Sequence, residues 1–167
     1  FTTPCVPATI PFFEGFENAE IGAYNNNTVP VCWTYLKTGP TANYPNGYVA
    51  TTAAKTGTKH FYTYRGSTHA GESLLISPET QNLGNGLKRL RFSARNYFTG
   101  SSYGQKLSIY SMDGNTASAN KTLIKTVVVP TTSYVEFIVY LPLSTTDDYF
   151  AFSFDEEAGL NKYIFID

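Results

Sequence analysis

The stretch LKRLRFSARNYF, residues 87–98, alternates apolar with polar side chains. Successive side chains of an extended strand point to opposite faces of a sheet. Leu90, Phe92 and Ala94 therefore share one face, which suits a hydrophobic core. This pattern predicts a β-strand with one buried face and one solvent-exposed face. The positions expected to face solvent are Arg89, Arg91, Ser93 and Arg95.

The same period of two recurs in seven more segments, which are separated by the turn-forming residues Gly, Pro, Asn and Asp. No segment shows a convincing helical period. About ten short strands at even spacing favour an all-β fold, an antiparallel two-sheet jelly-roll sandwich. The further segments are 59–66, 72–79, 105–114, 122–130, 134–142, 148–157 and 162–167.

Two connections between these strands have informative sequences. Asp113–Gly114 lies between two predicted strands and predicts a two-residue hairpin turn. Residues 38–58 are rich in Thr, Gly, Asn and Pro and predict a long loop, with at most a short strand at residues 48–50. Long loops on rigid sandwiches often carry binding residues.

The composition limits the classes of partner. The chain has 167 residues, among them 13 Tyr and 12 Phe, which is one domain of a size that buries a full core. Its formal net charge of −1 disfavours nucleic acid and anionic membranes as partners. No apolar run is long enough to insert into a membrane. Residues 1–11 lack the features of a signal peptide, so we expect any export signal to have been removed.

The two cysteines, Cys5 and Cys32, predict a disulfide. A cysteine pair in a chain rich in Tyr, Thr, Asn and Gly, with few Lys and Glu, is typical of an exported protein. The alternative is two buried free thiols. The bridge is the interpretation that the composition favours.

Possible catalytic motifs lack the context that their chemistry needs. Residues 100–104, GSSYG, match the letters of a nucleophile elbow around Ser102, but a strand follows where a helix is required. His60, His69 and Glu72 do not have the spacing of zinc ligands, and His60 is expected to be a half-exposed strand residue.

Acidic residues could in principle supply a glycosidase with its general acid and base. The candidates stand at strand ends beside turns, where solvated carboxylates are expected anyway, and no feature selects one pair over another. The sequence therefore predicts a protein that is not an enzyme. The candidate groups are Asp147 with Asp148, and Asp155 with Glu156 and Glu157.

Calcium is the better-supported chemistry. Glu17 follows an aromatic segment and Asp167 ends the strand YIFID, and a sandwich that places its first and last strands side by side would bring the two carboxylates together. Calcium binds about six to eight oxygen ligands, which can come from distant segments of a chain. The alternative is two ordinary hydrogen-bonded carboxylates. The residues alone leave both open.

Several tyrosines are candidates for ligand contact. Alternation or loop context leaves Tyr44, Tyr48, Tyr62 and Tyr64 accessible, and Tyr97 and Tyr103 share that context. Tyrosine faces suit stacking and hydrogen bonding to sugars or peptides. The alternative is that they are ordinary sheet surface or core.

Five motifs in a fixed order resemble one family. They are IPFFEGFEN (10–18), VPVCWTYL (29–36), GESLLISPE (71–79), YFAFSFDEEAG (149–159) and KYIFID (162–167). Together the chain resembles the cleaved-adhesin or choice-of-anchor J modules of Bacteroidetes surface and secreted proteins, which are relatives of MAM domains with a galactose-binding-like sandwich.

The resemblance implies a jelly-roll domain over residues 5–167, with residues 1–4 as a linker or the end of a preceding fibronectin type III-like module. The aromatic residues 12–16 would form the core of a first strand. A Cys5–Cys32 bridge would then clamp the entry to the domain.

For the metal, Glu17 and Asp167 match the family's acidic positions for structural Ca²⁺. The family's Asp-rich loop is replaced here by TGPTANYPNG, residues 38–47, where Asn43 and Asn46 are weaker candidate ligands.

These observations predict a non-catalytic, calcium-stabilised binding module, secreted or at the cell surface. Its expected partners are a glycan or an extracellular protein, together with neighbouring domains of the same polypeptide. The alternative is a structural spacer or secretion-associated domain without its own ligand. A small hydrolase is the less favoured third class.

Overall fold

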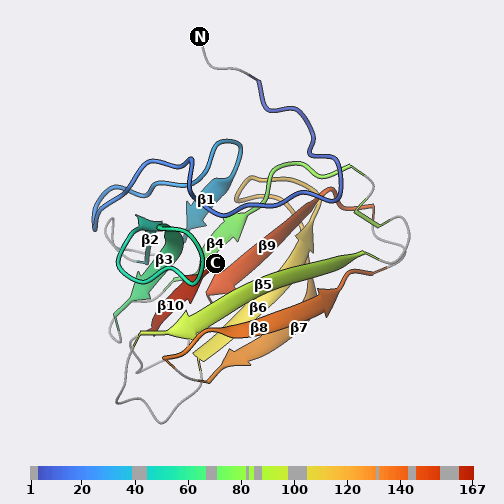
Figure 1. Ribbon diagram of the computed structural model, residues 1–167. Helices are drawn as coiled ribbons and strands as arrows, with labels where there is room; N and C mark the ends of the chain where they lie inside the picture. The colour runs from blue at the N-terminus through green and yellow to red at the C-terminus, as the bar shows by residue number, and fades with distance from the viewer. Residues whose placement is uncertain are drawn as a thin grey trace.

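The computed structural model describes residues 4–38, 45–66, 71–81, 83–84, 88–97, 105–130, 132–142, 146–154 and 162–167. Within these ranges the chain forms ten strands in two five-stranded antiparallel sheets, and no helix (Figure 1). The strands are β1 (Thr34–Lys37), β2 (Asn46–Ala50), β3 (His60–Arg65), β4 (Ser73–Ile76), β5 (Arg89–Asn96), β6 (Gln105–Met112), β7 (Lys121–Val129), β8 (Val135–Tyr140), β9 (Tyr149–Phe154) and β10 (Lys162–Ile166).

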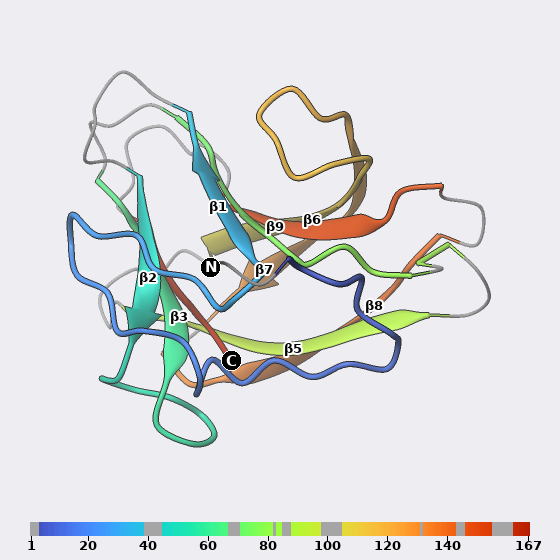
Figure 2. The same ribbon diagram turned by 90° about the horizontal axis from the view of Figure 1, so that it is seen from above.

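The chain passes repeatedly between the two sheets. The first sheet has the order β1-β4-β9-β6-β7, and the second has the order β2-β3-β10-β5-β8. Figure 2 shows the two layers edge-on, with β9 and β6 above β5 and β8. The last strand, β10, lies between β3 and β5, so its pairing joins the two parts of the second sheet. The two-sheet sandwich predicted from the sequence is confirmed.

The core fills the space between the sheets. Phe61 and Ile164 of the second sheet pack in one buried cluster with Leu75 and Phe152 of the first. Interdigitated inner faces of this kind are the usual core of a β-sandwich.

In β5 the predicted alternation holds for Phe92 and Ala94, which are buried in the core cluster, and for Arg89 and Arg91, which are exposed. The predicted exposure of Ser93 is wrong, because its side chain is 5% exposed and its hydroxyl accepts a hydrogen bond from the Lys55 ammonium at 2.8 Å. Arg95 is only partly exposed.

The prediction that residues 12–16 form a first strand is wrong. These residues belong to an irregular segment, residues 10–16, that we call the strap. Phe13 is 87% exposed, whereas Phe16 is 3% exposed and has a φ of 62°. Pro11 and Gly15 interrupt an extended backbone, and the Phe16 N–H donates to the Glu14 carboxylate at 2.6 Å instead of to a neighbouring strand.

The disulfide forms between the two predicted cysteines. Cys5 and Cys32 are bonded with their Cα atoms 5.6 Å apart, and the bridge ties the beginning of the chain to the turn before β1. The next residue, Trp33, is buried and meets the Phe150 ring edge-on at 5.8 Å. The predicted disulfide is confirmed, and Trp33 beside it is a packing anchor of the core.

The connection between β6 and β7 is longer than predicted. The strands end at Met112 and begin at Lys121, so Asp113–Gly114 does not form a two-residue turn. The Asp113 carboxylate accepts hydrogen bonds from the Asn120 backbone N–H at 2.8 Å and side-chain amide at 2.7 Å. The aspartate closes the hairpin loop through its side chain.

A search of the described residues finds no helix that is long and apolar enough to cross a membrane.

Gly47 of β2 supplies a test of this packing. An added Cβ there would lie 2.5 Å from the Tyr35 ring and 2.6 Å from the Phe61 ring, both rigid groups of the interior. We expect Gly47→Ala to lower the free energy of unfolding by about 1–3 kcal/mol, measured by chemical denaturation. Gly114→Ala is the control, because its Cβ would meet only Ala119 at 3.5 Å. Equal effects of the two substitutions would contradict the packing described here.

Candidate functional site

The outer face of the second sheet carries a concentration of tyrosines. Side chains alternate along β3, so Tyr62 and Tyr64 point away from the core that Phe61 enters. Tyr62 lies opposite Tyr48 of β2, and Tyr64 lies opposite Tyr163 of β10. We call this surface the tyrosine face; it comprises Tyr24, Tyr48, Tyr62, Tyr64, Tyr97, Tyr163 and Phe165.

Three of the four tyrosines predicted as ligand contacts lie on this face, namely Tyr48, Tyr62 and Tyr64. The fourth, Tyr44, lies outside the described residues, as does Tyr103. Tyr163 was not predicted, although its alternation with the buried Ile164 in KYIFID could have identified it. No sequence pattern could have added Tyr24, because it reaches the face from an irregular segment.

Four rings of the face form an exposed row that crosses the strands. Tyr24 and Tyr64 have ring centroids 6.4 Å apart, Tyr64 and Tyr163 are 4.5 Å apart, and Tyr163 and Tyr97 are 5.7 Å apart. The two ends of the row are open, since Tyr24 is 41% and Tyr97 is 55% exposed. The row therefore presents aromatic surface to solvent over the width of three strands.

A second, more buried row runs beside it. The Tyr48 and Tyr62 rings are 5.0 Å apart, and the Tyr62 and Phe165 rings are 5.2 Å apart. The Arg95 guanidinium then lies 4.6 Å from the Phe165 ring and 5.5 Å from the Tyr134 ring. Burial is the main cause that raises the pKa of Tyr62 and of Tyr134, so both phenols stay protonated near neutral pH.

His60 lies beneath one end of the face, and its predicted half exposure is wrong. Its side chain is 0% exposed, and its ring lies 4.5 Å from that of Phe165. Among the described residues neither ring nitrogen has a hydrogen-bond partner. Burial and the Arg95 charge lower the pKa of His60 to about 4, although Asp167 opposes this shift. The imidazole is therefore neutral at physiological pH.

Asp167 holds the loop that follows β2, residues 51–59. Its Oδ2 accepts hydrogen bonds from the backbone N–H groups of Lys55 at 2.7 Å and Thr56 at 3.1 Å. Its Oδ1 accepts one from the Thr56 hydroxyl at 2.7 Å. The same loop is tied to the start of β8, because the Tyr134 hydroxyl donates to the Ala53 carbonyl at 2.8 Å.

Glu17 holds the same loop two residues further along. Its Oε1 accepts from the backbone N–H groups of Thr58 and Lys59, each at 2.8 Å, and its Oε2 accepts from the Thr58 hydroxyl at 2.7 Å. The hydroxyl and the N–H groups lower the pKa of Glu17. The Lys59 ammonium in turn donates to the carbonyls of Glu17 and Ala19, at 2.8 and 2.7 Å.

Gly57 is required between these two anchor points. Its φ is 60°, and a Cβ at this position would overlap the Glu17 carboxylate. A side chain would therefore meet both backbone strain and a clash. Loop 51–59 with its two carboxylates is called the clasp below. It lies near the C-terminus in Figure 1, beside β2 and β3.

The clasp contains the two carboxylates that the sequence indicates as calcium ligands. It brings Glu17 and Asp167 to neighbouring positions of one loop and adds the hydroxyls of Thr56 and Thr58, which are hard oxygen donors of the kind that calcium prefers. The two carboxylates already accept N–H and O–H hydrogen bonds. Within the described ranges, no three or more Asp, Glu, His or Cys residues lie together in a group that could hold a metal ion.

The weaker calcium candidates are not brought to the clasp. Asn46 lies opposite Tyr64 at the far end of β2 from the loop, and Asn43 lies outside the described residues. The Asn46 side chain is 1% exposed, and neither of its amide atoms has a partner in the described part of the chain.

The enzyme candidates are also dispersed or outside the described residues. Glu72 pairs with Lys121 at 2.5 Å and accepts from Ser153 at 2.6 Å, which are structural contacts on the first sheet. Asp147 and Asp148 precede β9. The candidates that lie outside the described residues are His69, Ser102, Asp155, Glu156 and Glu157.

No protein-family model matches the sequence, and no curated protein sequence matches it. Solved structures do match the fold. The K2 cleaved adhesin domain of Lys-gingipain has a TM-score of 0.67 at 16% identity, over 93% of this chain and 95% of that chain. The K1 cleaved adhesin domain, from Porphyromonas gingivalis W83, has a TM-score of 0.66 at 17% identity, over 92% of both chains.

A carbohydrate-binding module shares the same architecture. The C-terminal family 22 carbohydrate-binding module of Clostridium thermocellum Xyn10B has a TM-score of 0.55 at 17% identity, over 94% of this chain and 89% of that chain. The chain therefore has the fold of the cleaved adhesin domains, which confirms the fold predicted from the sequence resemblance.

The buried His60 gives a pH-dependent stability. Its folded pKa of about 4 is below the unfolded value of 6.5, so the unfolded chain binds the proton more readily. The contribution is complete above about pH 6.5 and is lost as the pH falls toward 4. One unit of pKa shift corresponds to about 1.36 kcal/mol. We therefore expect the free energy of unfolding of the wild type to fall by about 3 kcal/mol over this pH window.

The matched variant is His60→Phe, which keeps a ring against Phe165 and removes the titration. Its free energy of unfolding, measured by urea denaturation at several pH values, should vary less between pH 6.5 and 4 than that of the wild type. Glu17 affects only the acidic end of this window, because the stability that its lowered pKa contributes begins to fall near the unfolded value of 4.5, and this loss is common to both proteins. Parallel pH curves for the two proteins would contradict the assignment.

Proposed function

We propose that the chain is a non-catalytic extracellular binding module and that the tyrosine face holds an extended carbohydrate. The observation that carries the proposal is the exposed row Tyr24, Tyr64, Tyr163 and Tyr97, whose neighbouring rings are 4.5 to 6.4 Å apart. The occurrence of the same fold in adhesin domains and in a family 22 carbohydrate-binding module supports it.

The chemistry of the face suits a sugar chain. Aromatic rings pack against the apolar C–H faces of pyranose rings, and phenol hydroxyls donate and accept hydrogen bonds with sugar hydroxyls. An ordinary tyrosine phenol has a pKa of about 10 and is protonated at neutral pH, so the phenols of both rows can donate as well as accept hydrogen bonds. A row of four rings across three strands favours a chain of several sugar units over a single terminal sugar.

The proposal includes no catalytic step. Asp167, the residue that follows β10, accepts hydrogen bonds from loop 51–59 with both of its carboxylate oxygens. His60 has a pKa near 4 and is closed off from solvent. Neither group is placed as the general acid or base that hydrolysis of a glycosidic bond requires.

The test is Tyr97→Ala, screened on a glycan array and then titrated against the best ligand. Loss of one stacking ring should weaken binding about fivefold to tenfold, equivalent to roughly 1–1.5 kcal/mol. Tyr140→Ala is the matched control, because Tyr140 is also an exposed tyrosine of the second sheet but lies outside both rows. Absence of saturable glycan binding by the wild type would reject the proposal in favour of a protein ligand or a spacer.

We further propose that Ca²⁺ binds at the clasp, where Glu17 and Asp167 would hold it together with oxygens of loop 51–59. A bound ion would offset the charge of the two carboxylates that anchor the loop. The proposal rests on their convergence on one loop.

Calcium removal tests this second proposal. An ion at 100 times its Kd stabilises the folded state by about 2.7 kcal/mol, so EDTA should lower the Tm by about 5–10 °C for a domain of this size. Glu17→Gln should abolish the EDTA effect, whereas Glu20→Gln, at an exposed position outside the clasp, should keep it. A wild-type Tm that does not change with EDTA would leave the clasp held by its hydrogen bonds alone.

The proposed location is the cell surface or the extracellular medium, which the Cys5–Cys32 disulfide supports. As a module of a larger exported protein, the chain would present its tyrosine face beside neighbouring domains.

A further inference from the structure

We infer that a cavity beneath the strap is a second binding site, which takes a small amphipathic carboxylate such as a medium-chain fatty acid. The cavity has a volume of about 450 Å³ and lies between residues 10–16 and the inner sides of the two sheets. Phe92 and Ile166 contribute to it from the core side of the second sheet. The tyrosine face occupies the other side of that sheet, so the two sites are separate.

The walls of the cavity are core residues. Trp33, Leu83, Phe150 and Phe152 line it, and each is at most 8% exposed. Protein interiors normally pack with few voids larger than a water molecule, so an opening of this size is not an ordinary packing gap. Ligand pockets have volumes of about 300–1,000 Å³, and apolar cavities bind apolar guests. The cavity thus has both the size and the lining of a ligand site.

The strap covers the cavity without sealing it. The Phe12 ring stacks 6.3 Å from that of Phe150, and Phe16 reaches Trp33 at 6.4 Å. Because residues 10–16 are not part of a strand, no ladder of backbone hydrogen bonds joins them to either sheet. The clasp through Glu17 follows the strap directly. The cover is therefore anchored at its end and open along its side.

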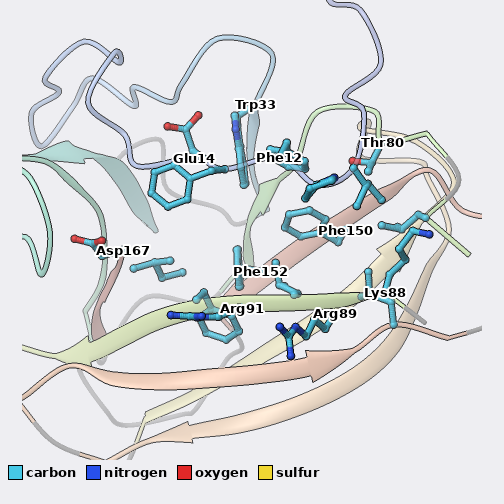
Figure 3. A pocket seen from close by; sticks show the side chains of 18 of the residues that line it. Phe12, Glu14, Trp33, Thr80, Lys88, Arg89, Arg91, Phe150, Phe152 and Asp167 are labelled. Atoms are coloured by element: carbon cyan, nitrogen blue, oxygen red, sulfur yellow. The ribbon is translucent and has the colours of Figure 1, made fainter. Parts of the chain in front are cut away.

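Charge differs between the two ends of the cavity (Figure 3). Glu14 and Asp167 lie at one end, and Lys88 and Thr80 lie at the other. Both carboxylates already accept hydrogen bonds, Glu14 from the Phe16 N–H and Asp167 from loop 51–59. A ligand carboxylate is repelled from the acidic end and attracted to the basic end. Arg89 of β5 also borders the cavity and adds to this potential. Arg91 borders it too, but lies toward the Asp167 end in Figure 3 and pairs with Glu136 at 2.9 Å.

The ligand is thus expected to place its apolar body against Phe150 and Phe152 and its carboxylate near Lys88. The single tryptophan of the chain, Trp33, lies in the wall. Its fluorescence therefore reports changes in the wall of this cavity.

The experiment titrates the protein with decanoate, decanol and decylamine below their micelle concentrations, following Trp33 emission and confirming the heat of binding by calorimetry. We expect saturable binding, tightest for decanoate and weakest for decylamine. Lys88→Gln should weaken decanoate about tenfold and change decanol by less than twofold. Equal affinity of the wild type for all three probes, or saturation by none of them, would overturn the inference.

A cavity-filling variant supplies an independent readout. Leu90 lines the cavity, so Leu90→Phe should reduce binding of decanoate and decanol alike, whereas Leu123→Phe, on an exposed position of β7, should leave both unchanged. Should Leu90→Phe fail to fold, the Lys88→Gln comparison decides alone. Tyr97→Ala should not affect decanoate binding, and an equal loss there would place the probe on the tyrosine face instead.

Discussion

The carboxylates of Glu17 and Asp167, from opposite ends of the chain, bind the same loop between β2 and β3. The positions of the strap, of β10 and of the loop itself depend on this contact. Six hydrogen bonds from residues 55, 56, 58 and 59 end on these two side chains. Buried or constrained backbone N–H groups need acceptors, and the charged carboxylates are strong ones. The clasp therefore fixes where the strap ends and how β10 terminates, two features that sequence order alone separates by 150 residues.

The clasp also explains how both proposed sites keep their shape. On one side of the second sheet it leads directly into His60 at the start of β3, whose ring packs against Phe165 and thereby supports the more buried tyrosine row. On the other side it anchors the strap, whose phenylalanines roof the cavity. Asp167 lies at the junction, because its carboxylate holds the loop while its backbone exchanges hydrogen bonds with Ser93 of β5.

Much of the fold could be predicted because alternation is a local signal. Each of the eight segments with a period of two contains a strand, since one buried face per strand is enough to set its orientation in the sandwich. The strap could not be predicted in this way. Residues 12–16 have the aromatic composition that is typical of a strand. Pro11 and Gly15 nevertheless prevent the regular backbone hydrogen bonds of a sheet. The pattern of hydrophobic residues alone does not show that these two residues decide the backbone conformation.

The candidate sites also contain features that local alternation predicts and features that it does not. Alternation placed Tyr62 and Tyr64 on one face, but the pairing of β10 between β3 and β5, which adds Tyr163 and Phe165, is a non-local property. The burial of His60 has the same origin, because its ring packs against Phe165 of β10, a residue far away in sequence. The cavity was missed altogether, since it arises where a regular element is absent.

The rigidity of the tyrosine face bears on what it can bind. The inner rings of the face, Tyr62, Tyr64, Tyr163 and Phe165, lie on paired strands and pack on one another, so little side-chain entropy remains to be lost there when a ligand docks. A face of this kind favours ligands that are themselves extended and repetitive, because each unit meets a ring that is already in place. A flexible peptide would have to lose its own backbone entropy on such a surface. The pairing of β10 with β3 and β5 fixes the positions of Tyr163 and Phe165. The topology of the sandwich, rather than a mobile loop, therefore sets the geometry of the inner part of the tyrosine face.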